Sequence, residues 1–133
     1  VVEVATVEEI PIVCDERALQ FILTQLLVNA VKYRNEQVQS EIRLETGFHQ
    51  AFERYYLKVA DNGIGVLQSD LPFVFDKGFT GDVNNQKQST GMGLFLVKKL
   101  CDDLRIDIEV ESQRGEGLTI QLLFPKVNTD SVC

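Results

Sequence analysis

The sequence has few of the residues from which several common kinds of functional site are built. Its 133 residues include one histidine, three cysteines and no tryptophan, and only 13 lysines and arginines against 20 aspartates and glutamates. The net charge of -7 argues against a nucleic-acid or anionic-membrane surface, because such surfaces need clustered basic side chains. The cysteines Cys14, Cys101 and Cys133 are far apart and include no C-x-x-C motif, so we expect reduced thiols rather than a zinc site or a disulfide framework.

Three further absences limit the possible architectures. No apolar run approaches the ~20 residues that a membrane-spanning helix needs. No G-x-x-x-x-G-K-[ST] motif is present, so a phosphate would have to be held by a scaffold other than a Walker loop. The N-terminus has neither an initiator Met nor a basic leader, and we expect the chain to be a piece of a longer protein. We interpret the sole histidine, His49, as a solvated turn residue that follows a break at Thr46-Gly47.

Composition and length favour one domain. Hydrophobic residues make up 44% of the chain, enough for a sizeable core. We place the domain at residues 1–126 and interpret residues 127–133 as a frayed C-terminal tail.

The stretch from Asp61 to Leu94 carries the clearest signals for a ligand. It begins with the glycine-rich turn 61–65 (Asp-Asn-Gly-Ile-Gly) and ends with a second one at 89–94 (Ser-Thr-Gly-Met-Gly-Leu). Between them, the polar residues 80–89 follow three phenylalanines and are typical of a lid. The second turn leads directly into an apolar-periodic helix, predicted from about Thr90 to Asp103, whose free N–H groups would favour a phosphate.

A longer helix is predicted from about Glu16 to Tyr33, with Asp15 as its N-cap. Apolar residues recur at helical spacing along it and predict one buried face. One edge would carry Gln25, Asn29 and either Lys32 or Tyr33, where an amide oxygen suits magnesium and a lysine suits phosphate. The alternative is an ordinary polar helix end.

Alternating patterns predict strands at residues 1–7, 40–46, 52–60, 105–111 and 118–124. In the last of these, Leu118, Ile120, Leu122 and Phe124 would form the inward face. Asp61 follows a predicted strand directly, so its carboxylate would be held rigidly and could accept from an amino group. Alternatively, Asp61-Asn62-Gly63 is only a turn.

The order of these motifs is more specific than any one of them. Together they resemble the catalytic and ATP-binding domain of bacterial sensor histidine kinases, within a wider group of ATPases that includes gyrase. Residues 25–33 resemble the N box, 61–65 the first glycine box, 75–79 the F box, 90–94 the second glycine box and 114–117 a weaker third glycine element. The sequence of residues 75–81, Phe-Asp-Lys-Gly-Phe-Thr-Gly, is similar to that of kinases from Gram-positive bacteria that respond to bacitracin and other antimicrobial peptides.

The resemblance implies an α+β fold, a two-layer α/β sandwich of the Bergerat type with a mixed sheet of about five strands covered on one face by about three helices. It implies that Asn29 binds Mg²⁺, that Asp61 takes the adenine amino group, and that Gln25, Asn29 and Lys77 act in catalysis. The implied nucleotide-binding residues are Asn29, Lys32, Tyr33, Asp61, Gly63, Ile64, Gly65, Phe75, Lys77, Phe79, Thr90, Gly91, Met92, Gly93 and Leu94.

The implied activity is transfer of the ATP γ-phosphate to a histidine on a dimerisation domain that this sequence lacks. The implied parent protein is a membrane-bound homodimer with this domain in the cytoplasm and a response regulator downstream. Hydrolysing relatives have a glutamate one turn before the metal-binding asparagine, whereas this chain has Gln25, which cannot act as a base. The alternatives are an ATPase or anti-sigma serine kinase of the same fold, or a non-catalytic nucleotide-binding module.

Overall fold

A computed structural model describes residues 2–6, 10–12, 14–77, 93–113 and 115–126, with the backbone alone for residues 2–6. In chain order its elements are β1 (Val2–Thr6), α1 (Glu16–Lys32), β2 (Ile42–His49), β3 (Arg54–Asp61), the short 3-10 helix η1 (Leu71–Phe73), α2 (Gly93–Asp103), β4 (Asp107–Gln113) and β5 (Gly117–Leu123). No helix in these ranges is long and apolar enough to cross a membrane.

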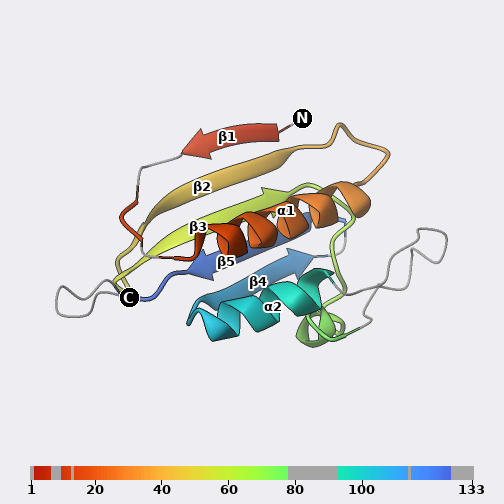
Figure 1. Cartoon of the computed structure of the whole chain (residues 1–133). Coiled ribbons are helices and arrows are strands. Elements are labelled where there is room, and N and C mark those ends of the chain that lie inside the picture. The colour runs from red at the N-terminus through yellow and green to blue at the C-terminus, as the bar shows by residue number, and fades with distance from the viewer. Residues whose placement is uncertain (1, 7–9, 13, 78–92, 114, 127–133) are drawn as a thin grey trace.

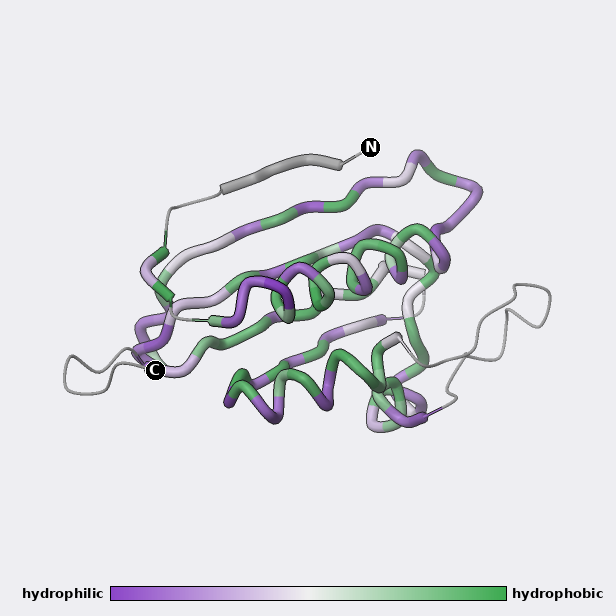
Figure 2. The backbone as a smooth tube through the Cα atoms, in the orientation of Figure 1, coloured by the Kyte–Doolittle hydropathy of each residue, from purple (hydrophilic) through white to green (hydrophobic). Residues whose placement is uncertain are grey.

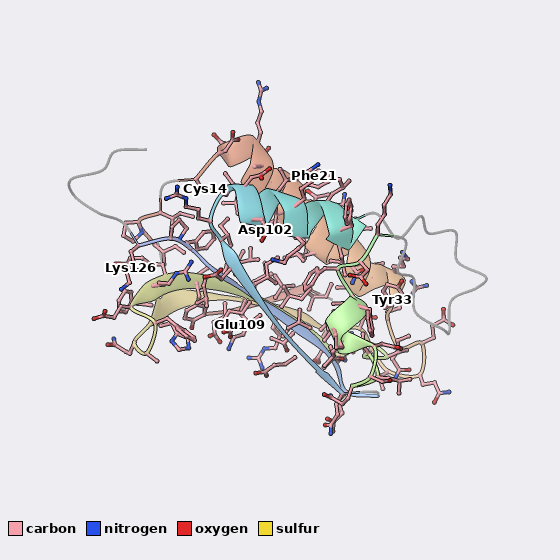
Figure 3. The ribbon with its side chains drawn as sticks, turned by 90° about the horizontal axis from the view of Figure 1, so that it is seen from below. Cys14, Phe21, Tyr33, Asp102, Glu109 and Lys126 are labelled. Atoms are coloured by element: carbon pink, nitrogen blue, oxygen red, sulfur yellow. The ribbon has the colours of Figure 1, made fainter. Side chains whose placement is uncertain are left out.

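The strands form one five-stranded sheet in the order β1-β2-β3-β5-β4. Strand β1 pairs with β2 in parallel, and the other neighbours are antiparallel, which confirms the predicted mixed sheet. Both α-helices lie on the same side of the sheet, so the molecule has two layers (Figures 1 and 3). Within the described ranges there are two α-helices and η1, so the count of about three holds only if η1 is included.

Helix α1 begins where its N-cap was predicted. The Asp15 Oδ1 accepts hydrogen bonds from the backbone N–H groups of Arg17 (2.9 Å) and Ala18 (3.1 Å). The helix ends at Lys32, one residue earlier than expected, with Tyr33 as its C-cap. Hydrophobic residues recur along α1 in Figure 2, and three of them, Ile22, Leu26 and Ala30, are buried.

The core lies between the helices and the sheet. Helix α2 contributes Val97 and Cys101, and β5 contributes the predicted inward residues Leu118, Ile120 and Leu122, with Phe124 directly after the strand. All of these are buried. Burial raises the pKa of the Cys101 thiol to about 12, so this cysteine behaves as an inert core residue.

The interpretation of the hairpin around His49 was wrong. Strand β2 continues through Thr46-Gly47 to His49, because Gly47 pairs with Tyr56 and leaves room for the Tyr56 ring, whose hydroxyl would lie 3.0 Å from an added Cβ. His49 is half-buried, with its ring centroid 4.6 Å from that of Phe52. It is therefore a strand residue in an aromatic cluster rather than a solvated turn residue.

One side chain ties three strands together on the side of the sheet away from the helices. The Arg54 guanidinium donates to the backbone carbonyls of Phe124 (2.7 Å), Leu123 (2.8 Å) and Arg105 (3.3 Å), and it pairs with Asp107. Only 16% of the Arg54 side chain is exposed. Its planar fork of donors is what allows several acceptors to be reached at once.

We predict that Arg54→Lys lowers the free energy of unfolding by about 1–3 kcal/mol, because one ammonium group cannot reach all of these acceptors and leaves part-buried carbonyls unpaired. Urea titration followed by circular dichroism measures this. Arg43→Lys on β2 is the matched control, since Arg43 is exposed, and it should change the value by less than about 0.5 kcal/mol. Equal effects of the two substitutions would contradict the role given to Arg54.

Candidate functional site

Asp61 is the last residue of β3, as predicted, and its carboxylate is held from two sides. Its Oδ1 accepts hydrogen bonds from the backbone N–H groups of Gly63 (2.9 Å) and Leu118 (3.2 Å). Burial raises the pKa of Asp61, while these two hydrogen bonds act in the opposite direction. Because both bonds go to Oδ1, Oδ2 remains able to accept from a ligand as far as the described residues show.

The first glycine turn packs against the end of α1. The Ile64 N–H donates to the Tyr33 carbonyl over 3.0 Å. A Cβ at Gly63 would lie 2.5 Å from the same carbonyl oxygen, so a larger residue would force the turn away from the helix. The structure therefore brings Tyr33, Gly63 and Ile64 together beside Asp61.

The first glycine turn also interlocks with the turn between β4 and β5. Gly65 has a φ of +73°, and a Cβ there would lie 2.2 Å from the Gln113 carbonyl oxygen. Gly117 has a φ of +101°, and a Cβ there would lie 2.0 Å from the Asp61 carbonyl oxygen. The Gly115 N–H donates to the Ile64 carbonyl over 2.6 Å. We call these contacts of residues 61–65 with Gln113, Gly115 and Gly117 the glycine interlock.

Sequence analysis missed two contributors to this arrangement. The Ser112 hydroxyl accepts from the Val66 N–H (2.7 Å) and donates to the Gly117 carbonyl (2.6 Å). Leu118 was predicted only as a core residue, yet its N–H binds Asp61. Every residue except proline has a backbone N–H, so the residue type of Leu118 does not indicate this role. A single serine in a strand is an ordinary surface residue, so the sequence did not single out Ser112 either.

The predicted edge of α1 lies between the glycine turn and the start of α2. The Gln25 Oε1 would be 2.6 Å from a Cβ at Gly93, the first residue of α2. One turn further along α1, the Asn29 side chain is half-buried. The Asn29 backbone carbonyl accepts a hydrogen bond from the Tyr33 N–H over 3.1 Å. The Lys32 Nζ lies 5.0 Å from the centroid of the Tyr33 ring. Figure 1 shows that α1 ends, β3 ends and α2 begins at the same side of the molecule.

The remaining predicted site residues are less closely placed or lie outside the described ranges. Leu94 is half-buried against the core, Phe75 is half-buried after η1, and Lys77 is exposed. No contact within the described ranges links Lys77 to Asp61 or Asn29. Phe79, Thr90, Gly91 and Met92, together with the lid 80–89, lie outside the described residues.

The glycine interlock predicts unequal effects for two glycines that both have positive φ. Gly115→Ala should cost about 1–2 kcal/mol of unfolding free energy from backbone strain alone, because nothing lies within 4 Å of its added Cβ. Gly65→Ala should cost at least about 2 kcal/mol more, since its Cβ overlaps the Gln113 carbonyl. Chemical denaturation of the two variants measures the difference, and equal losses would show that the close backbone contact is not a constraint.

Comparison with known proteins assigns the family. Residues 14–128 match the family described as "Histidine kinase-, DNA gyrase B-, and HSP90-like ATPase". The chain is 44% identical over 115 residues to sensor protein BceS of Bacillus subtilis (strain 168), covering 86% of this chain and 33% of BceS. It is 36% identical over 115 residues to the sensor histidine kinase GraS of Staphylococcus aureus (strain Mu50), covering 86% of this chain and 32% of GraS.

A solved structure agrees with these relatives. Full-length ShkA in complex with AMPPNP superposes with a TM-score of 0.73 at 25% identity, over 93% of this chain and 25% of ShkA. The chain spans about a third of the length of the curated relatives BceS and GraS. The family match covers the helix with Asn29, the strand end at Asp61 and the glycine turns in the expected order. The chain therefore belongs to the histidine kinase-, DNA gyrase B- and HSP90-like ATPase family, as the catalytic ATP-binding domain of a two-component sensor histidine kinase.

Proposed function

We propose that this domain binds Mg²⁺ and ATP between α1, the glycine interlock and the start of α2, and that it transfers the γ-phosphate to a histidine on another domain of its parent protein. The observation that supports this best is the Asp61 carboxylate, held through Oδ1 by two backbone N–H groups with Oδ2 left for a ligand. ATP binding itself follows from the family. ShkA was crystallised with the ATP analogue AMPPNP, which agrees with nucleotide binding in this family.

The geometry around Asp61 gives a reason for choosing adenine. An ionised carboxylate offers only acceptors, and adenine presents an amino donor where guanine presents a carbonyl acceptor. Guanine would place two acceptors opposite each other in a partly buried site, and each would lose its hydrogen bond to water without a replacement. Gly63 and Gly65 let the turn beside Asp61 pack closely on the Tyr33 and Gln113 backbone, which fixes the position of the turn.

The residues on α1 fit a magnesium ion that is shared with phosphate groups. Asn29 provides a neutral amide oxygen, a donor that Mg²⁺ accepts. The described residues contain no cluster of three or more His, Cys, Asp or Glu side chains able to form an all-protein metal site. A single protein ligand, with phosphate and water completing the shell, is the usual way that nucleotide enzymes hold this ion. The bound ion would neutralise charge on the phosphates.

The phosphate contacts would come from the end of α1, the segment after η1 and the start of α2. We assign Lys32 and Lys77 to the phosphates as point charges and Tyr33 to phosphate or ribose. Ile64, Phe75, Phe79 and Met92 would border the nucleotide. Thr90, Gly91, Gly93 and Leu94 would present backbone N–H groups at the start of α2. The contact between Gln25 and Gly93 supports this assignment, because it fixes the first residue of α2 against α1.

The acceptor histidine would be supplied by a dimerisation domain. The chain's only histidine, His49, packs among aromatic rings at the end of β2, at the opposite end of the β2–β3 pair from Asp61, which pairs with Ile42. Gln25 is an amide and cannot activate water as a base, which fits a reaction with an imidazole nucleophile. We assign residues 1–126 to the catalytic domain and 127–133 to a tail.

We extend the proposal to the parent protein. From the family resemblance we propose a homodimeric sensor in the cell membrane with this domain in the cytoplasm, a response regulator as the next phosphate acceptor, and antimicrobial peptides as the signal class. The relatives BceS and GraS are sensor proteins, which supports the sensor role.

The activity is tested by mixing the domain with the separately produced histidine-bearing domain of its parent and γ-labelled ATP. We expect an acid-labile label on the acceptor protein. Asn29→Ala should abolish both the transfer and the Mg²⁺-dependent part of ATP affinity, as measured by calorimetry with and without Mg²⁺. Asn35→Ala, in the loop after α1, is the control and should behave as wild type. Release of free phosphate without a labelled acceptor would favour an ATPase instead.

Replacing Asp61 tests adenine recognition. In Asp61→Asn the side-chain oxygen keeps the two backbone N–H groups, so the amide NH₂ takes the place of Oδ2 and faces the adenine amino group, donor against donor. We expect ATP affinity to fall by about 10-fold to 100-fold and GTP affinity to be unchanged or to rise, because the amide NH₂ can donate to the guanine carbonyl. Calorimetric titration of both nucleotides measures the effect. Equal preference for ATP and GTP in the unmodified domain would remove this role.

The unmodified domain and Asp61→Asn should differ in how their ATP affinity depends on pH. Adenine recognition needs the ionised carboxylate, and burial raises the pKa of Asp61. The ATP affinity of the unmodified domain should therefore fall as the pH decreases through this raised pKa. The fall should begin at a higher pH than the one at which an exposed aspartate protonates. Asp61→Asn should lack that step. Parallel curves for the two proteins would contradict it.

A further inference from the structure

We propose that Ser112 is a positioning residue for adenine recognition, acting through the single peptide group that joins Gly117 to Leu118. This inference rests on the proposed binding of ATP at Asp61. Ser112 lies on β4 and is half-buried, and nothing in its residue type or spacing marks it as part of a nucleotide site.

The argument begins with the two ends of that peptide group. At one end, the Gly117 carbonyl accepts a hydrogen bond from the Ser112 hydroxyl over 2.6 Å. At the other end, the Leu118 N–H donates to the Asp61 Oδ1 over 3.2 Å. These atoms belong to one planar unit, so neither end can turn without the other. A hydroxyl on β4 therefore controls the direction of a donor that holds the carboxylate on β3.

The peptide group needs such an anchor because it follows a glycine. Gly117 has a φ of +101°, in a region that glycine occupies easily and leaves easily. Its conformation is required by the close approach to the Asp61 carbonyl, where a Cβ would lie only 2.0 Å away. The glycine that permits the interlock thus removes the stiffness that a side chain would give, and the Ser112 hydroxyl restores it.

Only a hydroxyl at position 112 meets both requirements. It donates to Gly117 and at the same time accepts from the Val66 N–H over 2.7 Å. Val66 directly follows the first glycine turn, so Ser112 joins that turn to the β4–β5 turn. Alanine would leave the Val66 N–H and the Gly117 carbonyl part-buried without this partner. The glycine peptide would then be free to turn away from Asp61.

The expected consequence is a loss of selectivity rather than of binding in general. A carboxylate held by Gly63 alone can rotate, so its free oxygen no longer stays where the adenine amino group arrives. Contacts to the phosphates are made elsewhere and are the same for ATP and GTP. A positioning role therefore changes the ratio of the two affinities, whereas a merely structural role lowers the folded fraction and affects both nucleotides equally.

The experiment measures ATP and GTP dissociation constants by calorimetry, with Mg²⁺ present, for the unmodified domain, Ser112→Ala, Ser112→Thr and Gln68→Ala. Ser112→Ala should weaken ATP by about three- to tenfold and GTP by less, so that the affinity ratio contracts. Ser112→Thr keeps the hydroxyl and should restore the ratio. Gln68→Ala is the matched control, because the Gln68 amide donates to the Ser112 backbone carbonyl, and no hydrogen bond among the described residues joins it to the Gly117–Leu118 peptide group.

The outcomes separate this inference from the function on which it rests. An unchanged ATP-to-GTP ratio in Ser112→Ala, in a domain that prefers ATP, overturns the positioning role and leaves the proposed function standing. No preference for ATP in the unmodified domain overturns the adenine recognition itself. Thermal unfolding establishes that each variant is folded. If Ser112→Ala does not fold, Ser112→Cys carries the same test, since a thiol of similar size is a much weaker donor.

Discussion

The close backbone contact between the end of β3 and the turn before β5 is the constraint on which the site depends. Strand β5 lies between β3 and β4 in the sheet, so the turn from β4 to β5 arrives beside the residues that leave β3. The two segments approach so closely that Gly65 and Gly117 have no room for a Cβ. This approach brings the Leu118 N–H to Asp61 as a second donor beside the local Gly63 N–H. The two hydrogen bonds offset part of the cost of partly burying the carboxylate.

Helix α1 connects this turn to the rest of the site. Its buried residues Ile22, Leu26 and Ala30 fix its rotation on the sheet, and the same rotation turns the edge with Gln25 and Asn29 toward the start of α2. Its last turn meets the first glycine turn at the Tyr33 carbonyl. Core packing and the geometry of the candidate site are therefore set by one helix, and a shift of α1 would move Asn29 and the first glycine turn together.

The site is suited to a polyanion although the protein carries a net charge of -7. Attraction over long distances does not favour ATP here. In the proposed function, local donors would have to compensate, and backbone N–H groups would do so without adding a titratable charge. The far side of the sheet has a separate role, since Arg54 joins β3, β4 and β5 there through backbone carbonyls and leaves the helix side for the ligand. These bonds on the far side add to the stability that the core provides on the helix side.

Local chemistry made much of this predictable from the sequence. Apolar periodicity predicted α1 and the inward face of β5, and Asp15 predicted where α1 begins. The ordered glycine turns, together with Asn29 and Asp61, predicted the family, which the comparisons confirm. The roles of individual site residues stay predictions. Only the tertiary structure decided that Gly47 lies under a ring within β2, that His49 is a strand residue, and that Ser112 and the Leu118 N–H reach the Asp61 site. These depend on which strands become neighbours, and a residue's own type does not record which backbone will lie across from it.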